Sequence, residues 1–154
     1  LGDALAVALM IGRDFRPEDF AKFHPGGSLG KRLLTKVKDI MRKDNLPFVN
    51  ENSTMNEVIQ SISNGRLGMT MVGSANNFQG IITDGDLRRN LEKHSEKFHL
   101  LNAEQIMTKT PTTVTSQGKL MPAIEKMNQL NISVLPVFEN NQIQGVLHIF
   151  DCNL

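Results

Sequence analysis

The chain has 154 residues, of which 40% are hydrophobic, and its 17 Lys and Arg residues nearly balance 16 Asp and Glu residues. The length suits one or two domains with a buried core. The net charge of +1 gives no general electrostatic reason to bind nucleic acid or membranes. No apolar run approaches the roughly 20 residues of a membrane helix, and no export signal is recognisable. The single cysteine, Cys152, cannot form an internal disulfide, so we expect a reducing, cytoplasmic location.

The first segment differs from the rest of the chain. Residues 1–10 are apolar on nearly every side, which is typical of a helix that is buried on all faces. We therefore expect residue 1 to lie inside a longer parent protein. Pro17 suits the first turn of a short helix, and His24-Pro25-Gly26-Gly27 ends that helix.

Residues 31–43 form a basic stretch with six Lys or Arg residues and one Asp. This stretch could bind an anion or dock onto a partner. It could equally be a solvated junction between domains, because most runs of charge are solvated surface.

The next part of the chain alternates between helix and strand patterns. Thr54 and Glu57 have capping-box spacing, and apolar residues then recur at helical spacing. Two apolar strand patterns follow, joined by a polar turn. In chain order we expect a short leading helix over 37–41, a strand over 48–49, a helix from 55, strands over 69–72 and 78–83, and a closing helix from 84.

The remaining residues repeat this pattern. Residues 102–154 match residues 37–89 in character with a shift of 65 positions, so that Gly80 falls on Gly145. A repeat of this length is typical of two sister domains that pack together and leave two related clefts at their seam. In the second copy we expect a leading helix that ends at 106–107, a strand over 112–114, a helix capped by Ser116 with Pro122 in its first turn, and strands over 133–138 and 143–148.

A polar linker separates the two copies. It begins with the run His94-Ser95-Glu96-Lys97. We expect Leu100 and Leu101 to pin this linker to the core.

Each copy also carries a short motif. Gly80–Leu87 and Gly145–Asp151 share a glycine, two apolar residues, a polar residue and an aspartate three positions later. Each copy therefore resembles a cystathionine-β-synthase-type (CBS) domain. The resemblance implies an α/β fold, a tandem CBS domain pair of β-α-β-β-α units with pseudo-twofold symmetry. Many such pairs bind adenine nucleotides.

The motif of the first copy suits an anionic ligand. A strand ends at Thr83 and a helix begins there, so unpaired backbone N–H groups attract anions. The Thr83 hydroxyl could contact a phosphate, and Asp86 could accept hydrogen bonds from two ribose hydroxyls. Arg88 and Arg89 could pair with a phosphate. Alternatively, Thr83 and Asp86 only cap the helix.

The second copy departs from the family pattern. His148 replaces the Thr or Ser, although Asp151 remains. A histidine can still meet a phosphate, more strongly when it is protonated, or it can be a structural group that bonds to the backbone. His148 and Asp151 are therefore candidate ligand-binding residues, and whether this second cleft works stays open.

The N-terminal segment carries a further resemblance. Leu1–Ala6 and His24–Leu34, followed by the CBS pair, resemble the arabinose 5-phosphate isomerases, and the resemblance covers essentially the whole chain. It implies the end of a sugar-isomerase (SIS) domain before the pair. The domains expected are a SIS tail over 1–34, CBS domain 1 over 35–93, a linker over 94–102 and CBS domain 2 over 103–154.

This resemblance also implies an activity for the parent protein. The family interconverts D-ribulose 5-phosphate and D-arabinose 5-phosphate for the synthesis of Kdo, a sugar of lipopolysaccharide or capsule. Isomerisation through an enediol needs a base with a pKa near the working pH, and the resemblance makes His24 the catalytic candidate. The sugar-phosphate loop of a SIS domain lies upstream, so we expect this chain alone to be inactive. No catalytic cofactor and no metal site are expected.

Three functions stay open for the pair. It could be a regulatory module that binds AMP, ATP or CMP-Kdo, a nucleotide or nucleotide sugar, in its clefts. It could be a purely structural module that assembles the enzyme, as a homodimer of CBS pairs within a homotetrameric parent. It could also belong to a sugar-phosphate-sensing regulator, although no helix-turn-helix is visible and only the basic stretch 31–43 supports this function.

Overall fold

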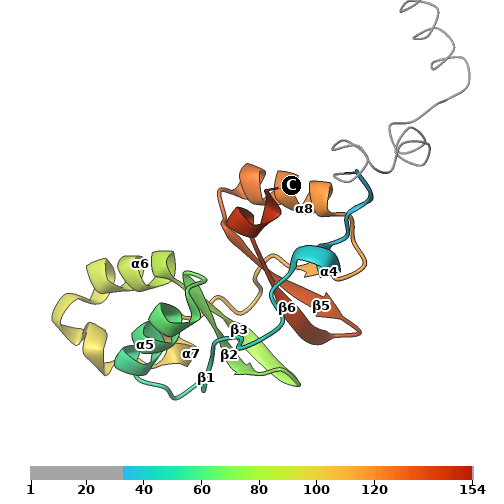
Figure 1. Cartoon of the computed structure of the whole chain (residues 1–154). Coiled ribbons are helices and arrows are strands. Elements are labelled where there is room, and N and C mark those ends of the chain that lie inside the picture. Colours follow the sequence, from blue (N-terminus) through green and yellow to red (C-terminus); the bar gives the residue numbers. More distant parts are fainter. Residues whose placement is uncertain (1–32, 154) are drawn as a thin grey trace, which may run out of the picture.

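The computed structural model describes residues 33–153, so His24 and most of the expected SIS tail lie outside the described residues. Two three-stranded sheets, with strand orders β1-β2-β3 and β4-β5-β6, occupy the centre of the described part (Figure 1). The first strand of each sheet runs parallel to the second, and the second pairs antiparallel with the third. No helix in this part of the chain is long and apolar enough to span a bilayer.

The two units contain matching elements. The first unit contains β1 (Phe48–Val49), α5 (Met55–Gly65), β2 (Met69–Ser74), β3 (Asn77–Thr83) and α6 (Asp84–His94). The second unit contains β4 (Val114–Thr115), α8 (Leu120–Leu130), β5 (Val134–Glu139), β6 (Gln142–His148) and the 3₁₀ turn η2 (Ile149–Cys152). Each unit is preceded in sequence by a short leading helix, α4 (Val37–Ile40) or α7 (Ala103–Ile106), and η1 (Ser95–Leu100) lies between the units.

The predicted repeat is confirmed in three dimensions. The bounds of α5, β2 and β3 coincide with those of α8, β5 and β6 after a shift of 65 positions. Both antiparallel pairs also contain a β-bulge at the same place, between Val72 and Gly73 and between Val137 and Phe138. The α/β fold of two sister units is therefore established.

The two central helices begin differently. Thr54 and Glu57 form the expected capping box at α5. The prediction that Ser116 caps α8 is wrong, because α8 begins after Lys119 and the buried Ser116 hydroxyl instead donates a hydrogen bond to Glu139. Pro122 does lie in the first turn of α8, where a missing N–H costs no helical hydrogen bond.

The linker is only partly pinned as expected. Leu101 packs against the core of the first unit together with Phe98. Leu100 instead leaves 71% of its surface exposed. The 3₁₀ geometry of η1 turns Leu100 outward and Phe98 inward, a detail that the two adjacent leucines did not reveal.

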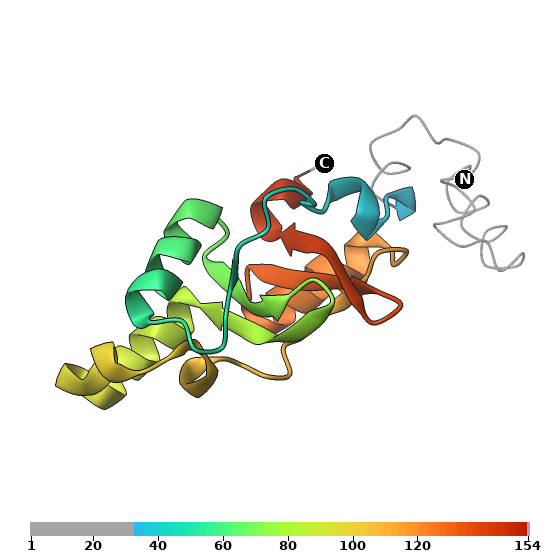
Figure 2. The ribbon, with the colours of Figure 1, turned by 90° about the horizontal axis from the view of Figure 1, so that it is seen from below.

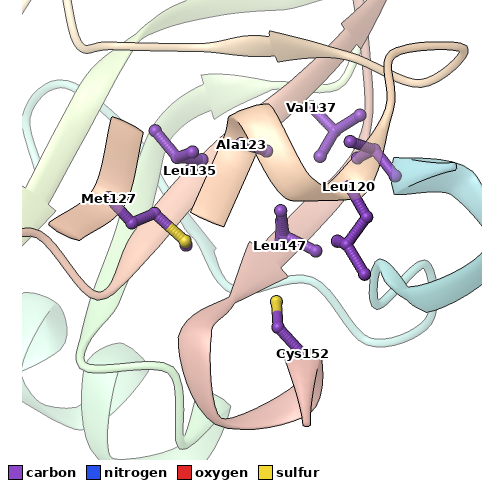
Figure 3. Packing of buried hydrophobic residues seen from close by; sticks show 8 residues of the cluster. Leu120, Ala123, Met127, Leu135, Val137, Leu147 and Cys152 are labelled. Atoms are coloured by element: carbon purple, nitrogen blue, oxygen red, sulfur yellow. The ribbon is translucent and has the colours of Figure 1, made fainter. Parts of the chain in front are cut away.

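The leading helices are exchanged between the units. Val37 of α4 is fully buried in the core of the second unit, beside α8, β5 and β6 (Figure 3). Ala103 and Ile106 of α7 are buried in the core of the first unit. Figure 2 shows the chain leaving α4 beside η2 and crossing to α5 of the other unit. Each hydrophobic core is therefore completed by a helix that belongs, in sequence, to the other copy.

Backbone hydrogen bonds hold this exchange. The first N–H groups of α4, at Val37 and Lys38, donate to the carbonyls of Gly118 and Ser116 at 2.9 and 3.0 Å. Those of α7 donate in the same way to carbonyls just before α5. These contacts satisfy N–H groups that a helix end leaves without an intrahelical partner.

The repeated glycines Gly80 and Gly145 allow the close approach of the exchanged segments. Arg42, which follows α4, exchanges two backbone hydrogen bonds of 2.9 Å with Val146 of β6. Thr108, which follows α7, exchanges bonds of 2.8 and 3.0 Å with Ile81 of β3. A Cβ on Gly145 would lie 2.4 Å from the Arg42 carbonyl oxygen, and a Cβ on Gly80 would lie 2.6 Å from that of Thr108.

A third cluster joins the inner faces of the two sheets. Its members from the first unit include Met69, Met71 and Ile81, and those from the second include Val146 and Ile143. The rings of Phe78 and Phe138 meet edge to face, with centroids 5.0 Å apart. Because this cluster is continuous, the two units share one apolar interior.

We expect Gly80→Ala and Gly145→Ala each to lower the free energy of unfolding by about 1–3 kcal/mol, because the new methyl group would displace a hydrogen-bonded backbone. Urea denaturation followed by circular dichroism measures this loss. Gly85→Ala is the matched control, since its Cβ would meet chiefly the movable Arg89 side chain. Equal stability of all three variants would contradict this account of the glycines.

Candidate functional site

A cleft of about 620 Å³ lies where β3 ends and α6 begins. One wall is the start of α6, a second is the segment 108–112 that follows α7, and a third is the segment 131–134 that leads into β5. All four candidates of the first copy, Thr83, Asp86, Arg88 and Arg89, line this cleft. The structure therefore brings the predicted residues of the first copy together in one place.

Thr83 and Asp86 form a capping box at the floor of this cleft. One Asp86 carboxylate oxygen, Oδ2, accepts hydrogen bonds from the Thr83 N–H at 2.9 Å and from the Thr83 hydroxyl at 2.7 Å. The Thr83 hydroxyl in turn accepts from the Asp86 N–H at 3.2 Å. The capping interpretation is therefore confirmed. A capping role does not exclude ligand contact, because both side chains also face the cleft.

Two arginines flank this capping box. Arg89 donates to the second Asp86 oxygen, Oδ1, at 2.6 Å, but its own side chain is 70% exposed. Exposed ion pairs contribute little stability, so Arg89 can leave Asp86 at small cost. Arg88 is exposed at the same cleft. Both guanidinium groups are therefore placed to meet a ligand phosphate near the start of α6.

The other walls of the cleft escaped the sequence analysis. They supply hydroxyl groups from Thr108, Thr110, Thr112 and Ser133, and apolar surface from Ile132. The threonine-rich run after α7 was a visible signal, but nothing in the sequence placed it beside α6. Apolar walls with a few polar groups are typical of small-molecule sites, and this set suits a flat base, a sugar and a phosphate.

The corresponding residues of the second copy have different partners. Asp151 is held by Arg42, whose Nε and Nη2 donate to the two carboxylate oxygens at 2.6 and 2.9 Å. His148 is nearly buried, and its Nδ1 accepts a hydrogen bond from the Phe150 N–H at 3.3 Å. Both lie at the end of β6, as predicted. Their role in ligand binding stays a prediction.

The basic stretch 31–43 is also partly engaged within the chain. Lys36 donates to the side chain of Gln117 at 3.2 Å, and Arg42 pairs with Asp151. The sequence analysis counted Arg42 only as one charge of this stretch. Its real partner lies 109 residues away in the sequence.

Burial and pairing shift the pKa values at the end of β6. Burial lowers the pKa of His148 below its usual 6.5, so the imidazole is neutral at neutral pH. A neutral His148 lacks the charge that would strengthen a phosphate contact. The hydrogen bonds from Arg42 lower the pKa of Asp151 below its usual 3.8, so this carboxylate stays ionised.

Titratable side chains do not cluster as metal ligands in the described part. No group of three or more His, Cys, Asp or Glu side chains within residues 33–153 is arranged to hold a metal ion. The buried thiol of Cys152 donates to the carbonyl of His148 at 3.3 Å, and burial raises its pKa. This thiol is therefore a packed group and a poor nucleophile.

The ion pair of Arg42 with Asp151 should make stability depend on acid. Because the folded protein lowers the pKa of Asp151, the pair contributes stability above pH 3.8 and loses it as the pH falls through the lower folded value. We expect the stability difference between the wild type and Asp151→Asn to be constant from about pH 7 to 5 and to shrink below pH 3.8. Urea denaturation across this pH range measures it. Asp44→Asn, at an exposed position without an ion pair in the described chain, should show no such change.

Comparisons with known proteins agree with this architecture. The CBS domain model matches residues 37–93 and 103–152. A CBS-domain protein from Agrobacterium tumefaciens has a similar crystal structure, with a TM-score of 0.68 and 21% identity over 77% of this chain and 96% of that chain. The CBS domain pair of protein MJ0100, crystallised with 5′-methylthioadenosine and S-adenosyl-L-methionine, has a TM-score of 0.65 and 24% identity over 76% of this chain and 91% of that chain.

A curated relative is similar over nearly the whole sequence. The chain is 45% identical over 153 residues to arabinose 5-phosphate isomerase KpsF of Escherichia coli. The match covers 98% of this chain but 46% of the relative, so the chain spans about half the length of that protein. Two matched motifs, two exchanged sister units and the family model agree, and the chain belongs to the CBS domain family as a tandem pair.

Proposed function

We propose that the chain is the regulatory part of an arabinose 5-phosphate isomerase and binds a nucleotide or nucleotide sugar in the first cleft. The observation that carries this proposal is the cleft at the start of α6, where Thr83, Asp86, Arg88 and Arg89 meet hydroxyl-rich walls. The similarity to the E. coli isomerase supports the identity of the parent enzyme.

In this proposal the catalytic residue lies before the pair. His24, in the motif His24-Pro25-Gly26-Gly27, would serve as the base or acid that moves a proton between neighbouring carbons of the sugar phosphate. The sugar-phosphate loop would be supplied by the portion of the parent that precedes this chain. The chain alone is then inactive, and the parent would supply arabinose 5-phosphate for Kdo.

The chemistry of the cleft favours a ligand with a base, a ribose and a phosphate. The MJ0100 pair, which shares this fold, was crystallised with two adenosine derivatives. Helix N–H groups and two arginines add a preference for phosphate. AMP, ATP and CMP-Kdo all fit this description, and CMP-Kdo would give feedback from the pathway that consumes arabinose 5-phosphate.

The position of the cleft explains how binding could regulate. Its walls come from α6 of one unit, the segment 131–134 of the other, and the segment 108–112 between them. A ligand that contacts all three will favour one relative placement of the two units. It changes the activity of the parent only if it binds two arrangements with different affinity.

Asp86 provides the test of ligand binding. We expect Asp86→Asn, which keeps an oxygen for the cap but removes the charge, to weaken nucleotide affinity by at least about tenfold. Calorimetric titration with AMP, ATP, CMP and CMP-Kdo measures the affinity and names the ligand. Asp44→Asn is the control with the same change of charge. Unchanged affinity in Asp86→Asn would contradict the assigned site.

Arg88 provides a test of the phosphate contact. We expect Arg88→Gln to weaken binding of the preferred nucleotide but not of its nucleoside, because the lost charge faces only the phosphate. The control is Arg66→Gln, at the exposed end of α5. Equal losses for nucleotide and nucleoside would mean that Arg88 does not meet the phosphate.

Assembly is the second candidate function, because apolar side chains remain exposed on the helices. Ile59 of α5, Leu91 of α6 and Leu130 of α8 keep 42%, 52% and 50% of their surface exposed. Such side chains suit a contact between copies in a homodimer of pairs. A stable dimer in analytical ultracentrifugation that binds none of the four nucleotides would favour assembly over regulation.

A further inference from the structure

The two motif aspartates are both held by arginines, but from different parts of the chain. Asp86 and Asp151 occupy the same repeat position. Asp86 contacts Arg89, three residues later in its own helix. Asp151 contacts Arg42, which reaches it from the exchanged segment after α4. The symmetry of the pair is therefore broken at the two positions where a ligand would be recognised.

Arg42 stands where the first cleft has a threonine. Arg42 pairs with Val146 of β6 in the same way that Thr108 pairs with Ile81 of β3, and these strand residues are repeat equivalents. Thr108 lines the first cleft. The same backbone position in the second unit therefore carries a long cationic side chain in place of a short hydroxyl, and this side chain reaches Asp151.

The Arg42 contact is also firmer than the Arg89 contact. Its backbone is fixed by two hydrogen bonds to Val146, and Gly145 lets it approach β6 closely. Its guanidinium binds Asp151 through two nitrogens, whereas Arg89 uses one. Its side chain is 41% exposed, against 70% for Arg89. Bidentate arginine–carboxylate pairs combine strength with fixed geometry, so Arg42 is harder to displace.

We propose that Arg42 is an autoinhibitory contact that keeps the second half of the pair closed to ligand. A ligand there would have to compete for Asp151 with a guanidinium that is tethered beside it at high effective concentration. This inference deepens the proposed function and rests on it. It implies one bound nucleotide for each chain, in the first cleft, and it assigns Arg42 a role that the family motif does not include.

Replacement of Arg42 by the residue found at its equivalent position tests this proposal. We expect the wild type to bind one nucleotide per chain and Arg42→Thr to bind two, with the added site lost in Arg42→Thr/Asp151→Asn. Calorimetry and equilibrium dialysis with the nucleotide preferred by the wild type, or with AMP and CMP if none is preferred, give the stoichiometry. Lys43→Thr is the control, because it removes one exposed positive charge at the next residue.

The outcomes separate this proposal from the proposed function. Two nucleotides per wild-type chain, or no added site in a folded Arg42→Thr, would overturn the closure by Arg42. If Arg42→Thr does not fold by circular dichroism, Arg42→Gln keeps most of the side chain and decides in the same way. No binding to the wild type but binding to Arg42→Thr through Asp151 would support closure while refuting the first cleft. No binding to either chain would overturn both.

Discussion

The close crossing of backbone at Gly80 and Gly145 is the constraint on which the rest of the structure depends. At each glycine, the segment after a leading helix pairs with a strand of the other unit, at a distance that a Cβ would not allow. This crossing commits α4 to the second core and α7 to the first. Neither unit has a complete core without the other, so the pair should unfold as one cooperative body and not as two independent domains.

The same crossing determines what faces each motif aspartate. It brings Thr108 to the start of α6, where a short hydroxyl side chain leaves a cleft. It brings Arg42 to the end of β6, where a long cationic side chain satisfies Asp151. One backbone arrangement, used twice, thus gives a cleft in one unit and an internal ion pair in the other. The difference lies in a single side chain and not in the fold.

The floor of the first cleft serves two purposes with the same atoms. Thr83 and Asp86 satisfy N–H groups at the start of α6, which holds this helix against the sheet. Most of the polar groups around them are already paired, and the contact of Asp86 with Arg89 is the most exposed of these. A ligand hydroxyl can therefore replace the Arg89 contact without breaking the cap, and the freed guanidinium can turn to a phosphate. Stability and recognition do not conflict at this position.

Local patterns in the sequence determined the elements. The capping box at Thr54 and the apolar alternation of β2, β3, β5 and β6 depend on neighbouring residues, and the repeat made the two units visible. The sequence also named Thr83, Asp86 and their arginines, because these lie within one short motif. The exchange of α4 and α7 could not be predicted, since both leading helices carry a similar apolar stripe that fits either core. Only the path of the chain in three dimensions decided which core each helix completes, and with it the pairing of Arg42 with Asp151.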